Sequence, residues 1–187
     1  PIFDNQPALK QLDKLILADV GTHILDVSRF LFGEAQQLCC QTRQIQQGIC
    51  GEDVATVLLS NQNGLTVACN MSYTSQWELN RFPQTMVTVE GTRRGVSLGR
   101  DYQLLQFSDG ETKCEQIVVD EYPWANPEYM VVHSSMVGCH RNLLAGLRGE
   151  ATAETTGDDN LRTLELVYAC YDSAANGRVV QLNSDDS

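Results

Sequence analysis

The sequence predicts an α+β domain built on a large, mostly antiparallel open sheet of about six strands, with helices packed on one face. Three observations support this fold class. An amphipathic helical segment comes early, strand-like segments separated by turn residues fill the middle, and helical segments return at the end. Strands joined by short turns pair antiparallel, because parallel pairing needs long crossovers. We expect the other face of the sheet to form an interface between copies of the chain.

The first predicted helix runs from Leu15 to about Gly33, a residue suited to ending a helix. At about 100° per residue, one of its faces is apolar. That face is formed by Ile16, Val20, Ile24, Val27 and Leu31.

Asp19 and His23 lie four positions apart on the flank of this helix, so we expect their side chains to touch. A carboxylate beside an imidazole is the arrangement that a general acid–base group needs near neutral pH. The same spacing also suits a polar pair that only satisfies itself, or two metal ligands. No third ligand with helix-fixed spacing supports a metal, so none is expected.

The middle of the chain predicts consecutive strands. They are expected at residues 37–46, 53–61, 65–73, 85–89, 96–98, 102–107 and 114–119. Asn63-Gly64 predicts a type I′ hairpin, and Ser108-Asp109-Gly110 predicts a second hairpin.

Two helices and a last strand (residues 178–182) follow. Asn126 and Pro127 begin the first of these helices, and Gly149 follows its last turn. His133 and His140 project from its apolar face, either as hydrogen-bonded core histidines or as a polar site at a pocket or interface.

The last helix is predicted to begin with a Thr156 cap and to end at Asn176-Gly177. Its apolar face is expected to consist of Leu161, Leu164, Tyr168, Tyr171 and Ala175.

The bulk properties fit one globular domain and exclude some partners. The chain has 187 residues, a formal net charge of −11, and 13 scattered Lys and Arg residues. Phosphate-backbone binding needs clustered cationic side chains, so we expect no nucleic acid and no anionic membrane as a partner. No apolar run reaches the roughly 18 residues that span a bilayer.

The seven cysteines include no C-x-x-C motif, which argues against a zinc ribbon or a thioredoxin-type site. Most fall in apolar segments, where a free thiol behaves as a small hydrophobe. A reducing compartment fits this pattern, and we expect a cytoplasmic protein. The chain also contains no G-x-G-x-x-G dinucleotide motif, no phosphate-binding loop and no G-x-S-x-G serine motif.

Residues 19–26, Asp-Val-Gly-Thr-His-Ile-Leu-Asp, resemble the D-x-G-x-H-x-x-D segment of the Gfo/Idh/MocA family (glucose–fructose oxidoreductase, inositol dehydrogenase, rhizopine catabolism). Segments 52–59, 63–64, 89–95, 149–150, 156–169 and 173–174 resemble later parts of the family in the same order. The resemblance covers nearly the whole chain.

The resemblance implies a two-domain oxidoreductase in which residues 1–187 form the C-terminal substrate-binding and oligomerisation domain. The N-terminal Rossmann domain, which would bind NAD or NADP, and the family's Glu-Lys-Pro segment are absent from this chain. The isolated chain should therefore bind no dinucleotide and be inactive. The full-length protein would be a homodimer or homotetramer.

The resemblance also implies roles for individual residues. His23 would be the acid–base group that moves the hydroxyl proton of a sugar or polyol, and Asp19 would orient it and bind substrate. Asp26 matches the motif too, although its helix phase also suits a structural bond to Arg29.

Trp77, Arg81 and Trp124 lie in irregular polar segments and are candidate substrate contacts or surface and dimer contacts. The alternative to a dehydrogenase domain is a non-catalytic ligand-binding or dimerisation module with the same fold.

Overall fold

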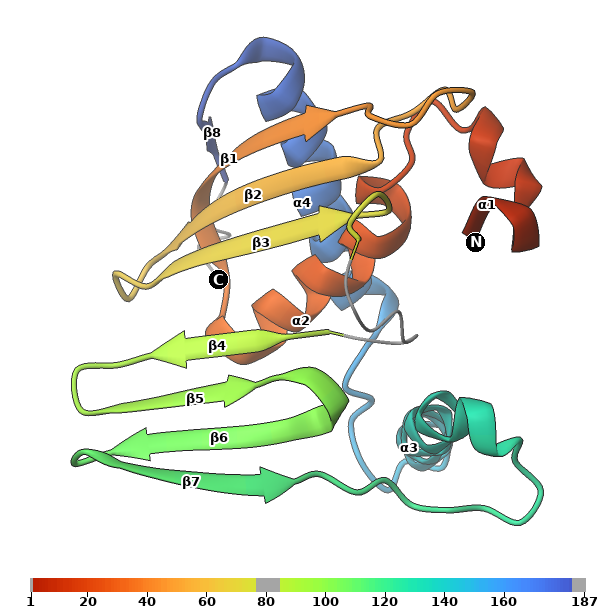
Figure 1. The fold of residues 1–187 in the computed structure, drawn as a ribbon, viewed down its shortest axis with the longest axis vertical. Coiled ribbons are helices and arrows are strands. Elements are labelled where there is room, and N and C mark those ends of the chain that lie inside the picture. Colours follow the sequence, from red (N-terminus) through yellow and green to blue (C-terminus); the bar gives the residue numbers. More distant parts are fainter. Residues whose placement is uncertain (1, 77–84, 183–187) are drawn as a thin grey trace. The chain divides into compact units, whose positions relative to one another are not determined.

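The computed structural model describes residues 2–76 and 85–182. The chain divides into two compact units, which are described separately: Pro1–Gln76 with Thr155–Ser187, and Trp77–Glu154. Each unit contains one four-stranded antiparallel sheet (Figure 1). The expected single sheet of about six strands is therefore wrong. Alternating patterns locate strands, but they do not say which strands pair across a connection longer than a hairpin turn.

The first unit combines a sheet of order β3-β2-β1-β8 with two long helices. Its elements are α1 (Ile2–Asn5), a 3-10 turn (Pro7–Gln11), a π-helical turn (Leu17–Gly21), α2 (Thr22–Phe32), β1 (Ala35–Arg43), β2 (Val54–Asn61), β3 (Thr66–Ser72), α4 (Gly157–Asn176) and β8 (Val180–Gln181). Helices α2 and α4 cover one face of this sheet (Figure 1).

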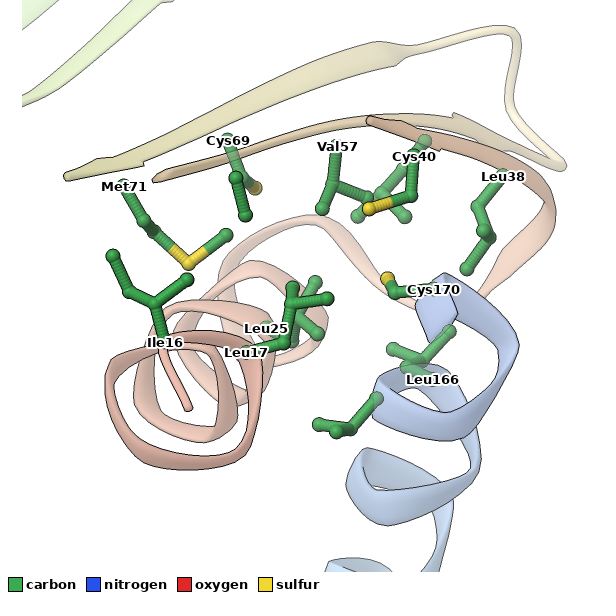
Figure 2. Packing of buried hydrophobic residues seen from close by; sticks show 13 residues of the cluster. Ile16, Leu17, Leu25, Leu38, Cys40, Val57, Cys69, Met71, Leu166 and Cys170 are labelled. Atoms are coloured by element: carbon green, nitrogen blue, oxygen red, sulfur yellow. The ribbon is translucent and has the colours of Figure 1, made fainter. Parts of the chain in front are cut away.

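The core of the first unit lies between that sheet face and the two helices (Figure 2). Its best-buried members include Ile16, Leu17, Leu25, Leu38, Cys40, Val57, Cys69, Met71, Leu166 and Cys170. The strand register puts Cys40 opposite Val57, and Val57 opposite Cys69. Three free thiols thus pack as small hydrophobes, fewer than the sequence predicts, because Cys50, Cys114 and Cys139 are exposed.

The opposite face of this sheet carries mainly short polar side chains. Thr56 donates a hydrogen bond to Asn70 across strands β2 and β3, with 3.0 Å between Oγ1 and Oδ1. Val57 and Leu59 face the core, and Leu58 alone of the three is exposed. The run 117–119, also expected in a strand, follows the end of β7. The expected apolar second face is therefore not formed by these runs.

Both predicted hairpins are present, but the turn type predicted for the first is wrong. Ser60 pairs with Thr66, so the first connection is longer than a two-residue turn, and only Gly64 of the Asn63-Gly64 pair has a positive φ, 80°. A type I′ turn needs two positive φ values. The second hairpin has them, at Asp109 (53°) and Gly110 (79°).

The second unit contains a sheet of order β4-β5-β6-β7 and one long helix. Its elements are β4 (Val87–Glu90), β5 (Arg94–Leu98), a 3-10 turn (Arg100–Tyr102), β6 (Gln103–Ser108), β7 (Glu111–Gln116), a 3-10 turn (Pro127–Tyr129) and α3 (Met130–Leu147). The predicted cap is confirmed, because the Asn126 side chain accepts a hydrogen bond from Glu128 N. His140 is exposed and His133 is half-buried, so neither is a core histidine. No helix in the described ranges is both long enough and apolar enough to cross a membrane.

The buried face of α4 differs from the expected one. Leu161, Leu164 and Tyr168 are exposed. The residues that pack inward are Thr163, Leu166, Val167, Cys170 and Ser173. Ser173 and Thr163 are buried because their hydroxyls are hydrogen-bonded; Ser173 Oγ, for example, accepts from Cys40 N at 2.9 Å. A pattern of apolar residues alone does not reveal such pairing.

Gly51 leaves no room for a side chain. A Cβ there would lie 2.5 Å from Leu12 O and 2.8 Å from Leu15 Cβ. We predict that Gly51→Ala lowers the free energy of unfolding by about 1–3 kcal/mol, because the backbone of residues 12–15 must move. Urea unfolding of the two proteins measures the difference. Gly157→Ala is the control, since a Cβ there meets nothing within 4 Å; equal stability of both variants would contradict the prediction.

Candidate active site around Asp19

Asp19 lies in the π-helical turn Leu17–Gly21, which continues directly into α2. Gly21 N donates to Ile16 O at 2.8 Å, a bond that spans one residue more than in an α-helix. Such single π turns occur frequently at functional sites. The wider turn also changes the angle between residues before and after it.

The Asp19 carboxylate is held by a tyrosine. The Tyr73 hydroxyl donates a hydrogen bond to Asp19 Oδ2. Tyr73 follows β3, and its ring packs edge-on against Phe3 with 5.9 Å between ring centroids. Burial, and then the bond to Asp19, raise the pKa of Tyr73 well above its usual value. The phenol is therefore a proton donor at neutral pH.

His23 lies in the first turn of α2 and is exposed. Within residues 2–76 and 85–182, no hydrogen bond or ion pair joins it to Asp19. The expected contact is therefore not made as a hydrogen bond or ion pair in the described structure. The expectation assumed α-helical spacing across residues 19–23, whereas the π turn replaces that spacing up to Gly21.

The backbone around Asp19 and Tyr73 is fixed by residues 52 and 53. Glu52 Oε1 accepts hydrogen bonds from Leu15 N and Leu17 N, each at 3.2 Å, and Glu52 O accepts one from Ile16 N. These are amide groups that the start of a helix leaves unpaired. Asp53 O accepts a bond from Tyr73 N at 2.9 Å. One short segment thus fixes both members of the Asp19–Tyr73 pair.

Glu52 has a second tyrosine partner. The Tyr171 hydroxyl, on α4, donates to Glu52 Oε1 at 2.7 Å. Burial, and then the Glu52 carboxylate, raise the pKa of Tyr171 above its usual value. The ammonium group of Lys14 lies 4.9 Å from the centre of the Tyr171 ring. The start of the π turn is therefore also tied to α4.

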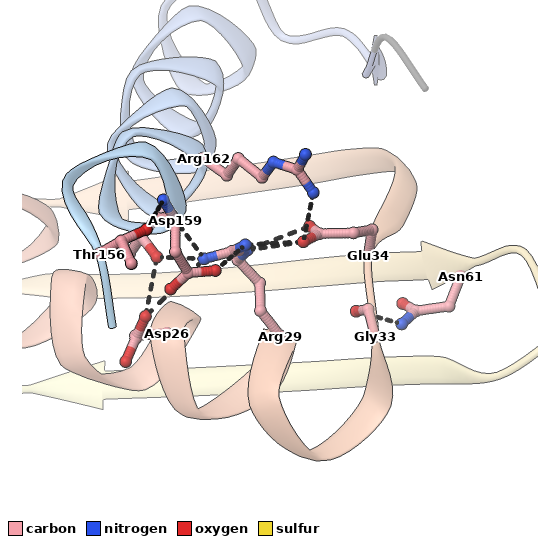
Figure 3. A network of polar contacts seen from close by, with 9 residues as sticks. Asp26, Arg29, Gly33, Glu34, Asn61, Thr156, Asp159 and Arg162 are labelled. Carbon is pink, nitrogen blue, oxygen red and sulfur yellow. Dashed lines mark hydrogen bonds and ion pairs between the residues drawn. The ribbon is translucent and has the colours of Figure 1, made fainter. Parts of the chain in front are cut away.

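Asp26, the last residue of the sequence motif, belongs to a structural network around Arg29 (Figure 3). Arg29 is 8% exposed and binds Glu34 at 2.7 Å and Asp159 at 2.9 Å. Its hydrogen bond to Glu34, more than any other contact, raises the pKa of the guanidinium. Asp26 lies 3.8 Å from Arg29 and accepts a bond from Thr163. The expected pairing of Asp26 with Arg29 is present as an ion pair within α2. The contacts of Arg29 with Asp159 and of Asp26 with Thr163 join α2 to α4.

Of the three candidate substrate contacts, one lies within the described residues and two do not. Trp77 and Arg81 lie outside the described residues. Trp124 belongs to the second unit, where its exposed ring stacks on Tyr122 with 5.3 Å between centroids and meets the edge of His133 at 5.6 Å. Within the described ranges, no group of three or more His, Cys, Asp or Glu side chains could hold a metal ion.

The sequence interpretation did not identify Tyr73, Glu52 or Tyr171. Tyr73 comes directly after a strand, which is a common place for a functional side chain, and this position was the available signal. Glu52 and Tyr171 act through contacts across 119 residues of sequence, and no local pattern reveals them.

Comparison with known proteins gives the class of this domain. A family profile described as the oxidoreductase family, C-terminal alpha/beta domain, matches residues 11–182. The chain therefore belongs to the Gfo/Idh/MocA family of oxidoreductases, as the motif around Asp19 and His23 indicates.

Particular relatives share most of this chain. It is 38% identical over 183 residues to a D-apiose dehydrogenase of Paraburkholderia graminis and 32% identical to a D-apiose dehydrogenase of Rhizobium rhizogenes. The alignments cover 98% of this chain but 49% and 53% of those proteins. The chain thus spans about half the length of the curated relatives it matches.

Solved structures share the fold. An oxidoreductase from Agrobacterium radiobacter, solved with NAD+, L-tartaric acid and magnesium, matches with a TM-score of 0.91 and 33% identity over 96% of this chain and 53% of its own. An aldose-aldose oxidoreductase from Caulobacter crescentus, complexed with glycerol, matches with a TM-score of 0.68 and 19% identity, over 90% of this chain and 48% of its own. The second likeness establishes the fold alone.

The half-buried tyrosines Tyr73 and Tyr171 predict a loss of stability at alkaline pH. Their pKa values are raised in the folded state. Above pH of about 10 the unfolded chain releases these protons while the folded chain keeps them, so the free energy of unfolding falls as pH rises. The fall amounts to at most about 1.4 kcal/mol per pH unit for each tyrosine.

Urea unfolding at a series of pH values measures this slope. Tyr73→Phe and Tyr171→Phe should each give a shallower slope than the unchanged protein. Tyr168→Phe, which alters an exposed ring, is the control. If all three variants keep the original slope, the phenols of Tyr73 and Tyr171 do not cause the alkaline loss.

Proposed function

We propose that the full-length protein is an NAD(P)-dependent dehydrogenase that transfers hydride between a sugar or polyol hydroxyl and a nicotinamide. This chain would be its C-terminal substrate-binding domain. The observation that carries the proposal is the Asp19 carboxylate, held by Tyr73 in a π turn that leads into the helix of His23. The two curated relatives are named D-apiose dehydrogenases, which makes D-apiose the first substrate to test.

The residues of this chain suit the proton transfer of such a reaction. The exposed His23 imidazole can take the proton of the reacting hydroxyl or return it. Asp19 keeps one oxygen, Oδ1, for which the described part of the chain provides no hydrogen-bond donor. That oxygen can accept a hydrogen bond from a substrate hydroxyl and orient the ring. When bound, the nicotinamide supplies or accepts the hydride.

The cofactor itself would be held elsewhere in the protein. This chain contains no glycine-rich loop that opens a helix after a strand, which is how dinucleotide phosphates are commonly bound. Relatives about twice as long have room for such a domain. An exposed apolar stripe of α2, Val27, Phe30 and Leu31, follows His23 on the same side of the helix. We assign this stripe to contact with the dinucleotide-binding half.

The proposal includes a homodimer or homotetramer in the cytoplasm. The antiparallel sheets and the family membership support assembly through this domain. The expected apolar sheet face does not contribute to the argument, because the face opposite the helices in the first unit is mainly polar. Light scattering of the full-length protein gives the mass and tests this part of the proposal.

We predict that His23→Ala lowers kcat of the full-length enzyme by about 10²–10⁴-fold, since general acid–base groups contribute that much. Asp19→Asn should also lower kcat. Steady-state kinetics with D-apiose and NAD or NADP measure both effects, and Kd for the cofactor should stay nearly the same. His140→Ala, which changes an exposed histidine on α3, is the matched control. Unchanged turnover in both variants of the site would favour the non-catalytic ligand-binding or dimerisation module.

We predict that residues 1–187 alone bind neither NAD nor NADP, whereas the full-length protein binds one of them. Isothermal titration calorimetry of both proteins tests this difference. Micromolar binding by the isolated chain would show that the cofactor site lies in this domain and would overturn the proposed division of roles.

A further inference from the structure

We propose that Tyr73 is a positioning residue for the reaction: its hydroxyl fixes the Asp19 carboxylate so that Oδ1 faces the substrate hydroxyl. This inference rests on the proposed function and extends it to a residue outside the sequence motif.

Tyr73 is itself held in place by two contacts. Its main-chain N–H donates a hydrogen bond to Asp53 O, and its ring packs edge-on against Phe3 at an interplanar angle of 75°. Phe3, Leu15 and Ile49 form a small buried cluster against which Tyr73 packs. The phenol therefore has little freedom to move away from Asp19.

The bond to Tyr73 gives the two oxygens of the Asp19 carboxylate different roles. Oδ2 accepts from Tyr73, whereas the described residues offer Oδ1 no donor. A carboxylate on a free side chain rotates about its last bond, because that torsion has a broad energy profile. A fixed donor on one oxygen sets the plane of the group and so aims the other. A neutral donor does this without cancelling the negative charge that a substrate hydroxyl would bond.

Because of the π turn, the Asp19 carboxylate needs an orienting partner other than His23. Asp19 lies within a turn that is wider than an α-helix, and in the described structure no hydrogen bond or ion pair joins its side chain to that of His23. His23 therefore does not orient Asp19. In the described structure the Tyr73 hydroxyl is the side-chain group that bonds to this carboxylate.

A structural role for Tyr73 predicts a different result from a positioning role. If the hydroxyl only stabilises the fold, its loss should reduce activity by the same factor whether or not Asp19 is present. If it acts through Asp19, its loss should have no further effect once the carboxylate is gone. A double-mutant cycle separates these cases.

The experiment measures kcat and KM of the full-length enzyme for the unchanged protein, Tyr73→Phe, Asp19→Ala and the double variant. Tyr73→Phe should lower kcat by about 10- to 100-fold with a smaller change in KM, because misplacing a reacting group costs about this much. Asp19→Ala and the double variant should have the same kcat. Tyr168→Phe, with its exposed ring, should keep full activity. Equal factors of loss in both backgrounds would overturn the proposal.

A second measurement needs no substrate and does not depend on the activity of Tyr73→Phe. Carbon-13 NMR of full-length protein labelled at the tyrosine Cζ and aspartate Cγ atoms detects the contact directly. The Tyr73 Cζ signal, assigned by its absence in Tyr73→Phe or by elimination, should shift in Asp19→Ala and stay in place in His140→Ala. A Tyr73 signal that does not shift in Asp19→Ala would refute the positioning role.

The two measurements separate this inference from the proposed function. If NMR shows the contact between Tyr73 and Asp19 but the full-length protein oxidises no sugar or polyol, the dehydrogenase proposal is refuted. The catalytic role assigned to Tyr73 is then refuted with it. An active enzyme whose Tyr73 and Asp19 variants behave independently would refute the positioning role alone.

Discussion

The Glu52 side chain joins parts of the first unit that are far apart in sequence. Its Oε1 atom accepts bonds from two amides at the start of the π turn and from Tyr171 on α4, while its main-chain carbonyl accepts a third amide. The next residue, Asp53, holds the main chain of Tyr73. The position of Asp19 thus follows from a connection between strands β1 and β2 rather than from the helix that carries it. Removing the Glu52 carboxylate would leave two main-chain N–H groups at the start of the helix without their hydrogen-bond acceptor. An unpaired buried polar group lowers the free energy of unfolding.

A second constraint comes from the Arg29 network at the other end of α2. Arg29 is buried and surrounded by Glu34, Asp159 and Thr163, so its charge is compensated where it lies. Asn61 donates two hydrogen bonds, to the carbonyl groups of Phe32 and Gly33, which end the helix. Figure 3 shows the bond to Gly33. The helix that carries His23 is therefore fixed at both ends by polar contacts and along its length by the core.

The sequence predicts local structure well where a local cause decides it. The Asn126 and Thr156 caps and most strand positions agree with the structure, because side-chain hydrogen bonds and alternation act within a few residues. The sequence predicts less of the structure where contacts between residues far apart in the chain determine it. The inward face of α4 depends on partners of Thr163 and Ser173 on other elements, and the division into two sheets depends on pairing that no period encodes. In the candidate site, Asp19 and His23 were found from a motif, but Tyr73 required three-dimensional proximity.

The π turn also bears on how this domain can change during evolution. A regular α-helix fixes the angle between all its residues, so a one-residue insertion rotates everything beyond it by about 100°. A π turn absorbs one extra residue locally, and the helix after it keeps its packing. In this chain the extra residue lies between the segment tied to Glu52 and the helix tied to Arg29. A one-residue insertion or deletion at residues 17–21 would therefore change the direction of the Asp19 side chain, while α2 keeps its packing against the core.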